Sequence, residues 1–171
     1  MNPIFLFRQA EDKDIPAIWK IILQAKEQMR KAGSQQWQDG YPNMEIIQKD
    51  IVRNNGFVLC HNKSEVIAYG SIIRDGEPSY KELKGHWLSN IPYIVVHRLA
   101  VADEMKHQGV ATYFFRQAEQ FALSHQIRSF RVDTNFDNRY MLHLLEKLKF
   151  TYCGKVSYGE RGDRLAYEKL L

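Results

Sequence analysis

The chain lacks the features that mark several classes of protein. Only two of its 171 residues are cysteine, Cys60 and Cys153; this excludes a disulfide framework, and their spacing fits no metal site, so we expect a reducing, cytoplasmic location. The six histidines show no spacing typical of metal ligands. No apolar run approaches the ~20 residues that a membrane helix needs. Arg8 and Glu11 lie close to the first apolar run, which excludes a signal-peptide core.

The bulk composition is that of an ordinary globular protein. Hydrophobic residues make up 44% of the chain, aromatic residues 12% and charged residues 26%, which excludes disordered and fibrous classes. The net charge of +4 suits an anionic ligand. Basic residues are scattered without a long run, which argues against nucleic acid as the partner. The length predicts one domain over residues 1–171.

Hydrophobic periodicity predicts alternating strands and helices. Strands are expected over residues 4–9, 57–61, 66–74, 93–101, 129–134, 151–158 and 165–170. Asp12 or Asp14, Asn43 and Asp137 are expected to cap three helices, and a further helix follows the turn at residues 106–111. We expect residues 75–90 to form a long polar loop. This order predicts an α+β fold, a mixed sheet with helices on its faces.

One stretch carries most of the chemical information. A predicted strand ends at Val101, a short turn contains Gly109, and an apolar face repeats at helical spacing from Ala111 onward. Amide N–H groups and the positive end of the helix dipole meet at such a turn and favour a phosphate. No Gly-Lys-Ser/Thr follows, which excludes a P-loop, and only one glycine of a dinucleotide fingerprint is present. The alternative is that Gly109 only relieves a tight turn.

Two blocks of the sequence resemble the GNAT superfamily of acyl-CoA-dependent N-acyltransferases. The first is Leu99-Ala100-Val101 followed by Lys106-His107-Gln108-Gly109-Val110-Ala111, with Lys106 in place of Arg or Gln. In the second block Asn138, Leu144 and Phe150 match the family's Asn-x-x-Ala-x-x-Leu-Tyr-x-x-x-Gly-Phe helix. Met141, Leu145 and Lys149 depart from that pattern.

The resemblance implies a fold and a reaction. It implies a twisted, mostly antiparallel sheet that splays at the family's fourth and fifth strands. The implied reaction is direct attack of an amine, on a small molecule or a peptide, on acetyl-CoA in a ternary complex. Lys106 or Arg116 would add positive charge near the pyrophosphate, and a backbone N–H near Leu99 would polarise the thioester carbonyl. The residues that the resemblance assigns to the cofactor are Leu99, Ala100, Val101, Lys106, His107, Gln108, Gly109, Val110, Ala111, Thr112 and Asn138. For Asn138 a role in capping its own helix is the alternative.

The sequence leaves alternatives for the residues that accept and donate protons in this reaction. His97, just before the cofactor segment, is a candidate base; the alternatives are a structural histidine and a chain of solvent molecules. The family's tyrosine acid is replaced by Leu145. Tyr140, Cys153 or Tyr158 would then supply the acid, or none is needed, because thiolate with a pKa near 8.5 is a fair leaving group.

Aromatic residues in two predicted loops are candidates for binding the acceptor. Trp37 and Tyr41 lie in the first loop beside Gln36 and Gln38, and Tyr80 and Trp87 lie in the second. Such rings wall pockets but also anchor loops to a core. Asp75, Glu77 and Glu82 are candidates for attracting an ammonium group.

Two other functions stay open at this stage. A GNAT-fold module that binds acyl-CoA without turnover, as a sensor, fits the missing tyrosine. Binding of nucleic acid through the basic surface is weaker and predicts a steep salt dependence. The sequence predicts a monomer or a homodimer that binds neither membrane nor nucleic acid.

Overall fold

The computed structural model describes residues 4–171, and the chain forms two compact units. Unit 1 runs to Ile72 and resumes over His97–Gln117. Unit 2 consists of Ile73–Val96 and Ala118–Leu171. Because strand β5 (Ile94–Val101) and helix α3 (Val110–Ser124) each contribute residues to both units, the chain passes between them inside regular elements.

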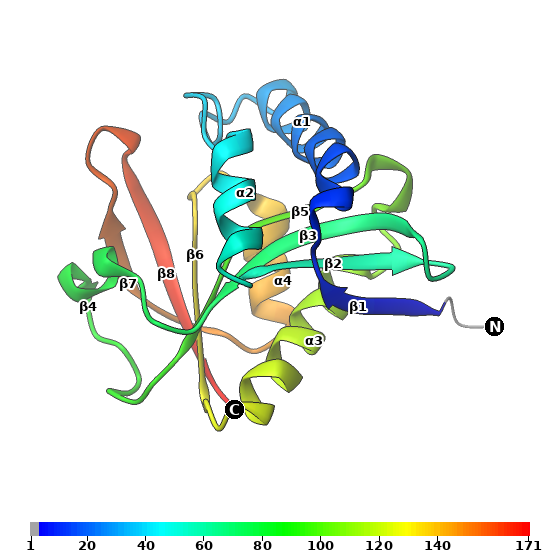
Figure 1. Ribbon diagram of the computed structural model, residues 1–171. Helices are drawn as coiled ribbons and strands as arrows, with labels where there is room; N and C mark the ends of the chain where they lie inside the picture. The colour runs from blue at the N-terminus through cyan, green and yellow to red at the C-terminus, as the bar shows by residue number, and fades with distance from the viewer. Residues whose placement is uncertain (1–3) are drawn as a thin grey trace. The chain divides into compact units, whose positions relative to one another are not determined.

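The strands form a mixed, mostly antiparallel sheet (Figure 1), with the hydrogen-bonded order β1-β2-β3-β5-β6-β8-β7-β4. The strands are β1 (Phe5–Gln9), β2 (Gly56–His61), β3 (Glu65–Ile73), β4 (Lys84–Gly85), β5, β6 (Ser129–Thr134), β7 (Thr151–Ser157) and β8 (Asp163–Leu170). The other long helices are α1 (Ile15–Lys31), α2 (Met44–Val52) and α4 (Arg139–Lys147). β5 runs parallel to β6, with Ile94 opposite Phe130 and Val95 opposite Arg131. The fold class is therefore as predicted. The separation of the family's fourth and fifth strands, which the resemblance implies, stays a prediction.

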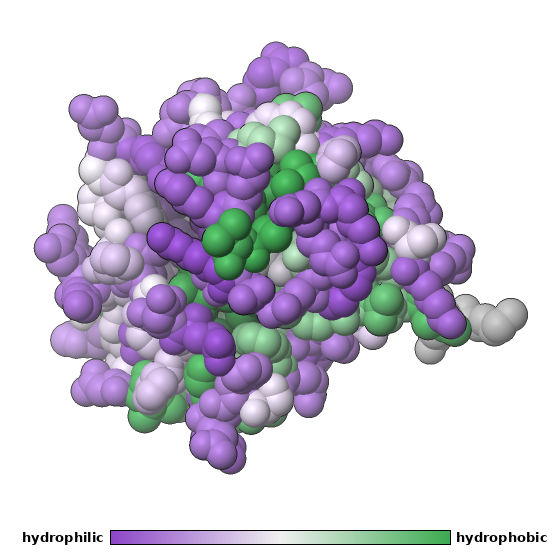
Figure 2. All heavy atoms as spheres, in the orientation of Figure 1, coloured by the Kyte–Doolittle hydropathy of each residue, from purple (hydrophilic) through white to green (hydrophobic). Residues whose placement is uncertain are grey.

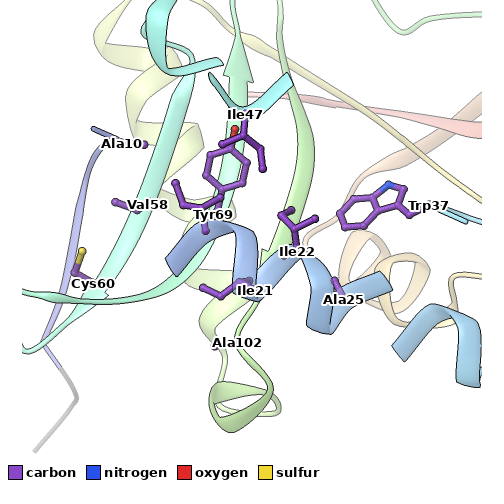
Figure 3. Packing of buried hydrophobic residues seen from close by; sticks show 12 residues of the cluster. Ala10, Ile21, Ile22, Ala25, Trp37, Ile47, Val58, Cys60, Tyr69 and Ala102 are labelled. Carbon is purple, nitrogen blue, oxygen red and sulfur yellow. The ribbon is translucent and has the colours of Figure 1, made fainter. Parts of the chain in front are cut away.

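In unit 1, α1 and α2 lie side by side (Figure 1) and share a core with the strands. Residues of a strand alternate between faces, and Val58 and Tyr69 point into this core. Figure 3 shows the Tyr69 ring beside Ile47 and the Trp37 ring beside Ile22. The buried face of α1 consists of Ile18, Ile21, Ile22 and Ala25.

The opposite face of the unit 1 strands packs against the start of α3. The ring of Phe114 meets that of Phe7 edge to face, 5.6 Å between centroids. A Cβ added at Gly70 would lie 2.6 Å from Cζ of Phe114, so this close approach needs glycine. Helices thus cover both faces of the unit 1 strands, as the sequence predicts.

Two of the expected helix caps are wrong. Asp14 stands at the start of α1 but makes no side-chain cap there; its carboxylate instead accepts from the Arg8 guanidinium at 2.7 and 2.9 Å and from the Glu11 N–H at 2.8 Å. α4 is capped by Asn138 rather than Asp137, because Oδ1 of Asn138 accepts the Met141 N–H at 3.1 Å. Adjacent residues of similar capping preference cannot be ranked from sequence.

The Arg8–Asp14 ion pair predicts part of the acid sensitivity of the fold. Its hydrogen bonds from Arg8 lower the pKa of Asp14 below its ordinary 3.8. Because this pKa is lower in the folded state, the pair stabilises above about pH 4, and the stabilisation is lost as pH falls through the folded value. We expect Asp14→Asn to be less stable than wild type near pH 7 and the difference to shrink below pH 4, in urea titrations across pH. The exposed Asp12→Asn is the control, and an equal pH dependence for all three proteins would contradict the assignment.

The predicted long polar loop of unit 2 is partly structured. Residues 75–90 contain the short 3₁₀ helix η2 (Pro78–Glu82) and strand β4, which pairs with β7. Tyr80 is only 2% exposed and packs against Trp87, with 5.1 Å between ring centroids. The buried Tyr80 ring and the partly buried Trp87 ring thus order a segment whose polar composition is typical of a loop.

Glu168 on β8 fastens the end of this segment to the sheet. Its carboxylate accepts from the Leu88 N–H at 2.5 Å and from the hydroxyls of Ser89 and Ser129 at 2.6 Å each. Nε of Arg131 lies 3.4 Å from Oε1 of Glu168. Burial alone would raise the pKa of Glu168, but the two hydroxyls, the Arg131 charge and the Leu88 N–H outweigh it and hold that pKa below its ordinary value.

Most residues on the face shown in Figure 2 are hydrophilic, with hydrophobic residues surfacing in patches. Within the described part of the chain, no helix has the length and apolar composition needed to cross a membrane.

Candidate functional site

Strand β5 is distorted where the cofactor segment begins. Arg98 has φ +59°, a left-handed conformation that is rare for any residue but glycine and indicates a bulge within a strand. His97, the candidate base, is half-buried immediately before it. Leu99, Ala100 and Val101 follow the bulge, so the backbone predicted to face the acyl donor starts at the distortion.

A buried ion pair holds this distortion in place. The Arg98 guanidinium, with 9% of its side chain exposed, donates from Nε and Nη2 to the Asp50 carboxylate at 2.9 and 2.6 Å. Its Nη1 donates to the hydroxyl of Tyr41 at 2.8 Å. No local sequence pattern predicts this pair; an arginine within an apolar strand and an aspartate within an amphipathic helix are its only signals in the sequence.

The Asp50 carboxylate also binds two hydroxyls of β3. Oδ2 accepts from Tyr69 and Oδ1 from Ser71 at 3.1 Å. Burial, reinforced by the negative charge of Asp50, raises the pKa of Tyr69 far above its ordinary value, so this phenol stays a donor. Asp50 therefore links α2, β3 and the bulge of β5 through a network whose members are all paired.

The turn before α3 keeps its amide groups available. His107, Gln108 and Gly109 are exposed, and Gly109 has φ +77° with nothing within 4 Å of an added Cβ. Among the described residues, no acceptor pairs with the N–H groups of residues 108–112; the first bonded amide is that of Tyr113, which donates to the Gly109 carbonyl at 2.9 Å. The start of α3 thus presents unpaired donors and an open approach, as an anion site requires.

The Lys106 ammonium group is bound by two side chains of the protein. Its Nζ donates to Oδ1 of Asp103 at 2.6 Å and to the side chain of Gln28 on α1, and 17% of its side chain is exposed. The Asp103 N–H in turn binds Oε1 of Gln24 at 3.0 Å. Lys106 therefore fastens the turn to α1, with its charge offset by Asp103. Arg116 is exposed on α3.

The proton donors considered for unit 2 differ in their surroundings. Leu145, at the family's tyrosine position, is fully buried. Tyr140 is 51% exposed on α4. The Cys153 thiol is buried and donates to the Thr151 carbonyl, and burial raises its pKa. The Tyr158 hydroxyl donates to Oδ2 of Asp133 at 2.7 Å, so its proton is already engaged in a hydrogen bond to a carboxylate.

Each predicted acceptor-binding aromatic residue is anchored within its own unit. In unit 1, Trp37 is 8% exposed within the core, and Tyr41 accepts from Arg98. In unit 2, the Tyr80 hydroxyl donates to Oδ2 of Asp133 at 2.6 Å, and Nε1 of Trp87 donates to the Tyr80 carbonyl at 3.0 Å. The structure therefore brings Tyr80 and Trp87 together. Asp133, which no sequence pattern marked as a site residue, lies beside Tyr80.

The comparisons define the class of the protein. Residues 17–150 match the model of the acetyltransferase (GNAT) family, so the chain belongs to this family of acetyltransferases. No curated protein gave a match.

Solved structures support the same assignment. A GNAT-family acetyltransferase from Streptococcus agalactiae is 34% identical, with 98% of this chain and 95% of that chain covered and a TM-score of 0.88. Two more distant structures share the fold. The ribosomal-protein-S18-alanine N-acetyltransferase of Escherichia coli is 13% identical, with 98% and 94% covered and a TM-score of 0.68. An agmatine N-acetyltransferase is 15% identical, with 98% and 99% covered and a TM-score of 0.69.

Proposed function

We propose that this acetyltransferase moves the acetyl group of acetyl-CoA directly to an amine of a small molecule or peptide, as a single domain over residues 1–171. The observation that carries the proposal is the set of unpaired N–H groups at residues 108–112, at the start of α3. Donors gathered at a helix N-terminus suit the pyrophosphate of CoA, and the exposed Gly109 leaves room for it.

The chain's own residues perform three tasks in this proposal. The amides of residues 108–112 hold the pyrophosphate. The Arg98–Asp50 pair fixes the bulge of β5, so that the backbone of Leu99–Val101 keeps the geometry needed to bind pantetheine and donate to the thioester oxygen. Bound acetyl-CoA supplies an activated acetyl group with thiolate as the leaving group. Asn138 caps α4 through Oδ1, and a contact of Asn138 with CoA is what the family resemblance implies.

Proton transfer needs one base and no obligatory acid. An alkylamine with a pKa near 10 must lose a proton before it attacks; His97 and a chain of solvent molecules remain the two candidates for accepting it. A departing thiolate does not require protonation, which fits the burial of Leu145 at the position where the family carries tyrosine.

The test is the release of free thiol from acetyl-CoA in the presence of a panel of primary amines. We expect thiol release above the amine-free rate, with an equal yield of acetylated amine by mass spectrometry, for at least one member. Saturable binding of acetyl-CoA with no turnover across the panel would instead favour the sensor, and absence of acetyl-CoA binding would reject both.

A further inference from the structure

A hollow of about 760 Å³ in unit 2 is lined by α4, by the turn after this helix and by strands β7 and β8. Helix α4 contributes Arg139, Leu142, His143 and Glu146. These four residues stand at positions i, i+3, i+4 and i+7, so they share one face of the helix. Small-molecule sites typically have volumes of about 300–1,000 Å³. The hollow therefore has the size to accept a small molecule.

The rest of the lining is largely aromatic. Phe150 is 8% exposed, and Tyr152 on β7 is 51% exposed. Tyr167 on β8 lies opposite Tyr152 in the ladder, and their rings meet edge to face with 5.6 Å between centroids. Burial, with Tyr152 and Glu146 adding to it, raises the pKa of Tyr167, so its phenol stays a donor. The hollow thus offers a flat apolar surface on which another ring can pack.

The polar groups of the hollow have no partner in the described part of the chain. The side chains of Arg139, His143 and Lys149 form no hydrogen bond or ion pair with it, and neither do the hydroxyls of Tyr152 and Tyr167. Groups able to donate hydrogen bonds therefore line one hollow without being used by the fold.

The more buried cations of unit 2 are, by contrast, bound within the protein. Nε of Arg131 lies 3.4 Å from the Glu168 carboxylate. Nζ of Lys169 lies 2.6 Å from the Glu119 carboxylate. Arg164 donates to two backbone carbonyls. The cations at the hollow are thus left to meet a ligand.

The charges of the lining favour an anion with a single negative charge. Arg139 and Lys149 carry two positive charges against the one negative charge of Glu146, which leaves one net positive charge before any contribution of His143. Lys149 is only three residues from Glu146, whereas Arg139 is seven residues away, or about 10 Å along the helix. The anion is therefore expected at Arg139, whose planar fork of N–H donors matches a carboxylate. His143, one turn further along the same face, adds another donor.

Another hollow of unit 2 is less suited to an anion. It has a volume of about 380 Å³ and is lined by two cations, Arg74 and Lys81, and two carboxylates, Asp75 and Glu77. Its charges therefore balance without a ligand.

We propose that the hollow beside α4 binds a small aromatic carboxylate, with the ring packed against Tyr152 and Tyr167 and the carboxylate on Arg139. All of its lining residues belong to unit 2, and none of them is assigned to acetyl-CoA or to the amine. The site is therefore complete within one unit and does not depend on the proposed acetyl transfer.

The experiment is a calorimetric titration that compares 2-naphthylacetate with its neutral amide, 2-naphthylacetamide, which has the same ring and nearly the same shape. For the wild type we expect the carboxylate to bind about tenfold or more tightly than the amide, which corresponds to roughly one charge-assisted hydrogen bond. Arg139→Gln removes the charge and keeps a donor, so this preference should fall to about threefold or less. Tyr152→Leu removes a ring and keeps an apolar side chain, so it should weaken both ligands by a similar factor and leave the preference in place.

Arg128→Gln is the matched control, because it removes an exposed arginine of the same unit that lies outside the hollow. It should keep both the affinity and the preference. Absence of binding to the wild type, equal affinity for the two ligands, or an undiminished preference in Arg139→Gln would overturn the site. An equal loss in Arg128→Gln would show non-specific binding to basic side chains and would overturn it as well. Should Tyr152→Leu not fold, the two arginine variants still decide. Because acetyl-CoA is absent from these titrations, their outcome is independent of the test of the proposed function.

Discussion

Gly109→Trp is expected to weaken the binding of acetyl-CoA by about 100-fold or more. The indole would occupy the open space in front of the α3 amides, where nothing lies within 4 Å of an added Cβ. Hydrogen bonds to a charged group contribute about 1.5–3 kcal/mol each, so losing two of them corresponds to about 100-fold in affinity. Calorimetric titration of acetyl-CoA measures the effect directly.

The effect of backbone strain in Gly109→Trp has to be distinguished from the effect of losing the binding site for acetyl-CoA. Gly109 has φ +77°, where a side chain costs about 1–2 kcal/mol. Gly33 offers a matched control, because it is exposed in the same unit, has φ +79° and also has nothing within 4 Å of an added Cβ. We expect Gly33→Trp to lose similar stability in urea and to bind acetyl-CoA normally. A folded Gly109→Trp variant with wild-type affinity would show that the pyrophosphate binds elsewhere.

The second large effect is expected at Asp50. Asp50→Ala leaves the buried Arg98 guanidinium without its carboxylate and removes the acceptor of the Tyr69 and Ser71 hydroxyls. Removal of one partner from a buried ion pair costs about 3–5 kcal/mol. We expect the free energy of unfolding, measured in urea by circular dichroism, to fall by that amount.

The same helix provides the control for Asp50. Glu45 pairs with Lys49 at 3.0 Å, with both side chains largely exposed, and such pairs contribute about 0.5 kcal/mol or less. Glu45→Ala should therefore be close to wild type in stability. Because Arg98 also fixes the bulge of β5, Asp50→Ala should bind acetyl-CoA more weakly even under conditions where it is fully folded. Stability and affinity both within error of Glu45→Ala would contradict the role given to the pair.

Local signals explain why much of the fold could be predicted. Alternating apolar residues placed the strand at residues 129–134 with its observed bounds, and the capping preference of asparagine placed Asn43, whose Oδ1 accepts the Ile46 N–H. The loop at residues 75–90 could not be predicted, because its order comes from the distant Glu168 and from rings that pack only in the folded chain.

The residues of the candidate site also fall into those that the local sequence predicts and those that it does not. Gly109 and the start of α3 were recognisable because turn chemistry and helical periodicity are local. Asp50 and Arg98 lie 48 positions apart in the chain, and Tyr80 and Asp133 lie 53 apart. No local pattern connects such residues, so neither pair could be found from the sequence.

By itself, the sequence determined the family, the order of the main strands and helices, and the position of the turn before α3, because each of these follows from neighbours along the chain. Only the tertiary structure decided which charges are buried and which groups surround them. The energy of a carboxylate depends on the groups that folding brings around it, and for Asp50 and Asp133 those groups come from distant parts of the chain.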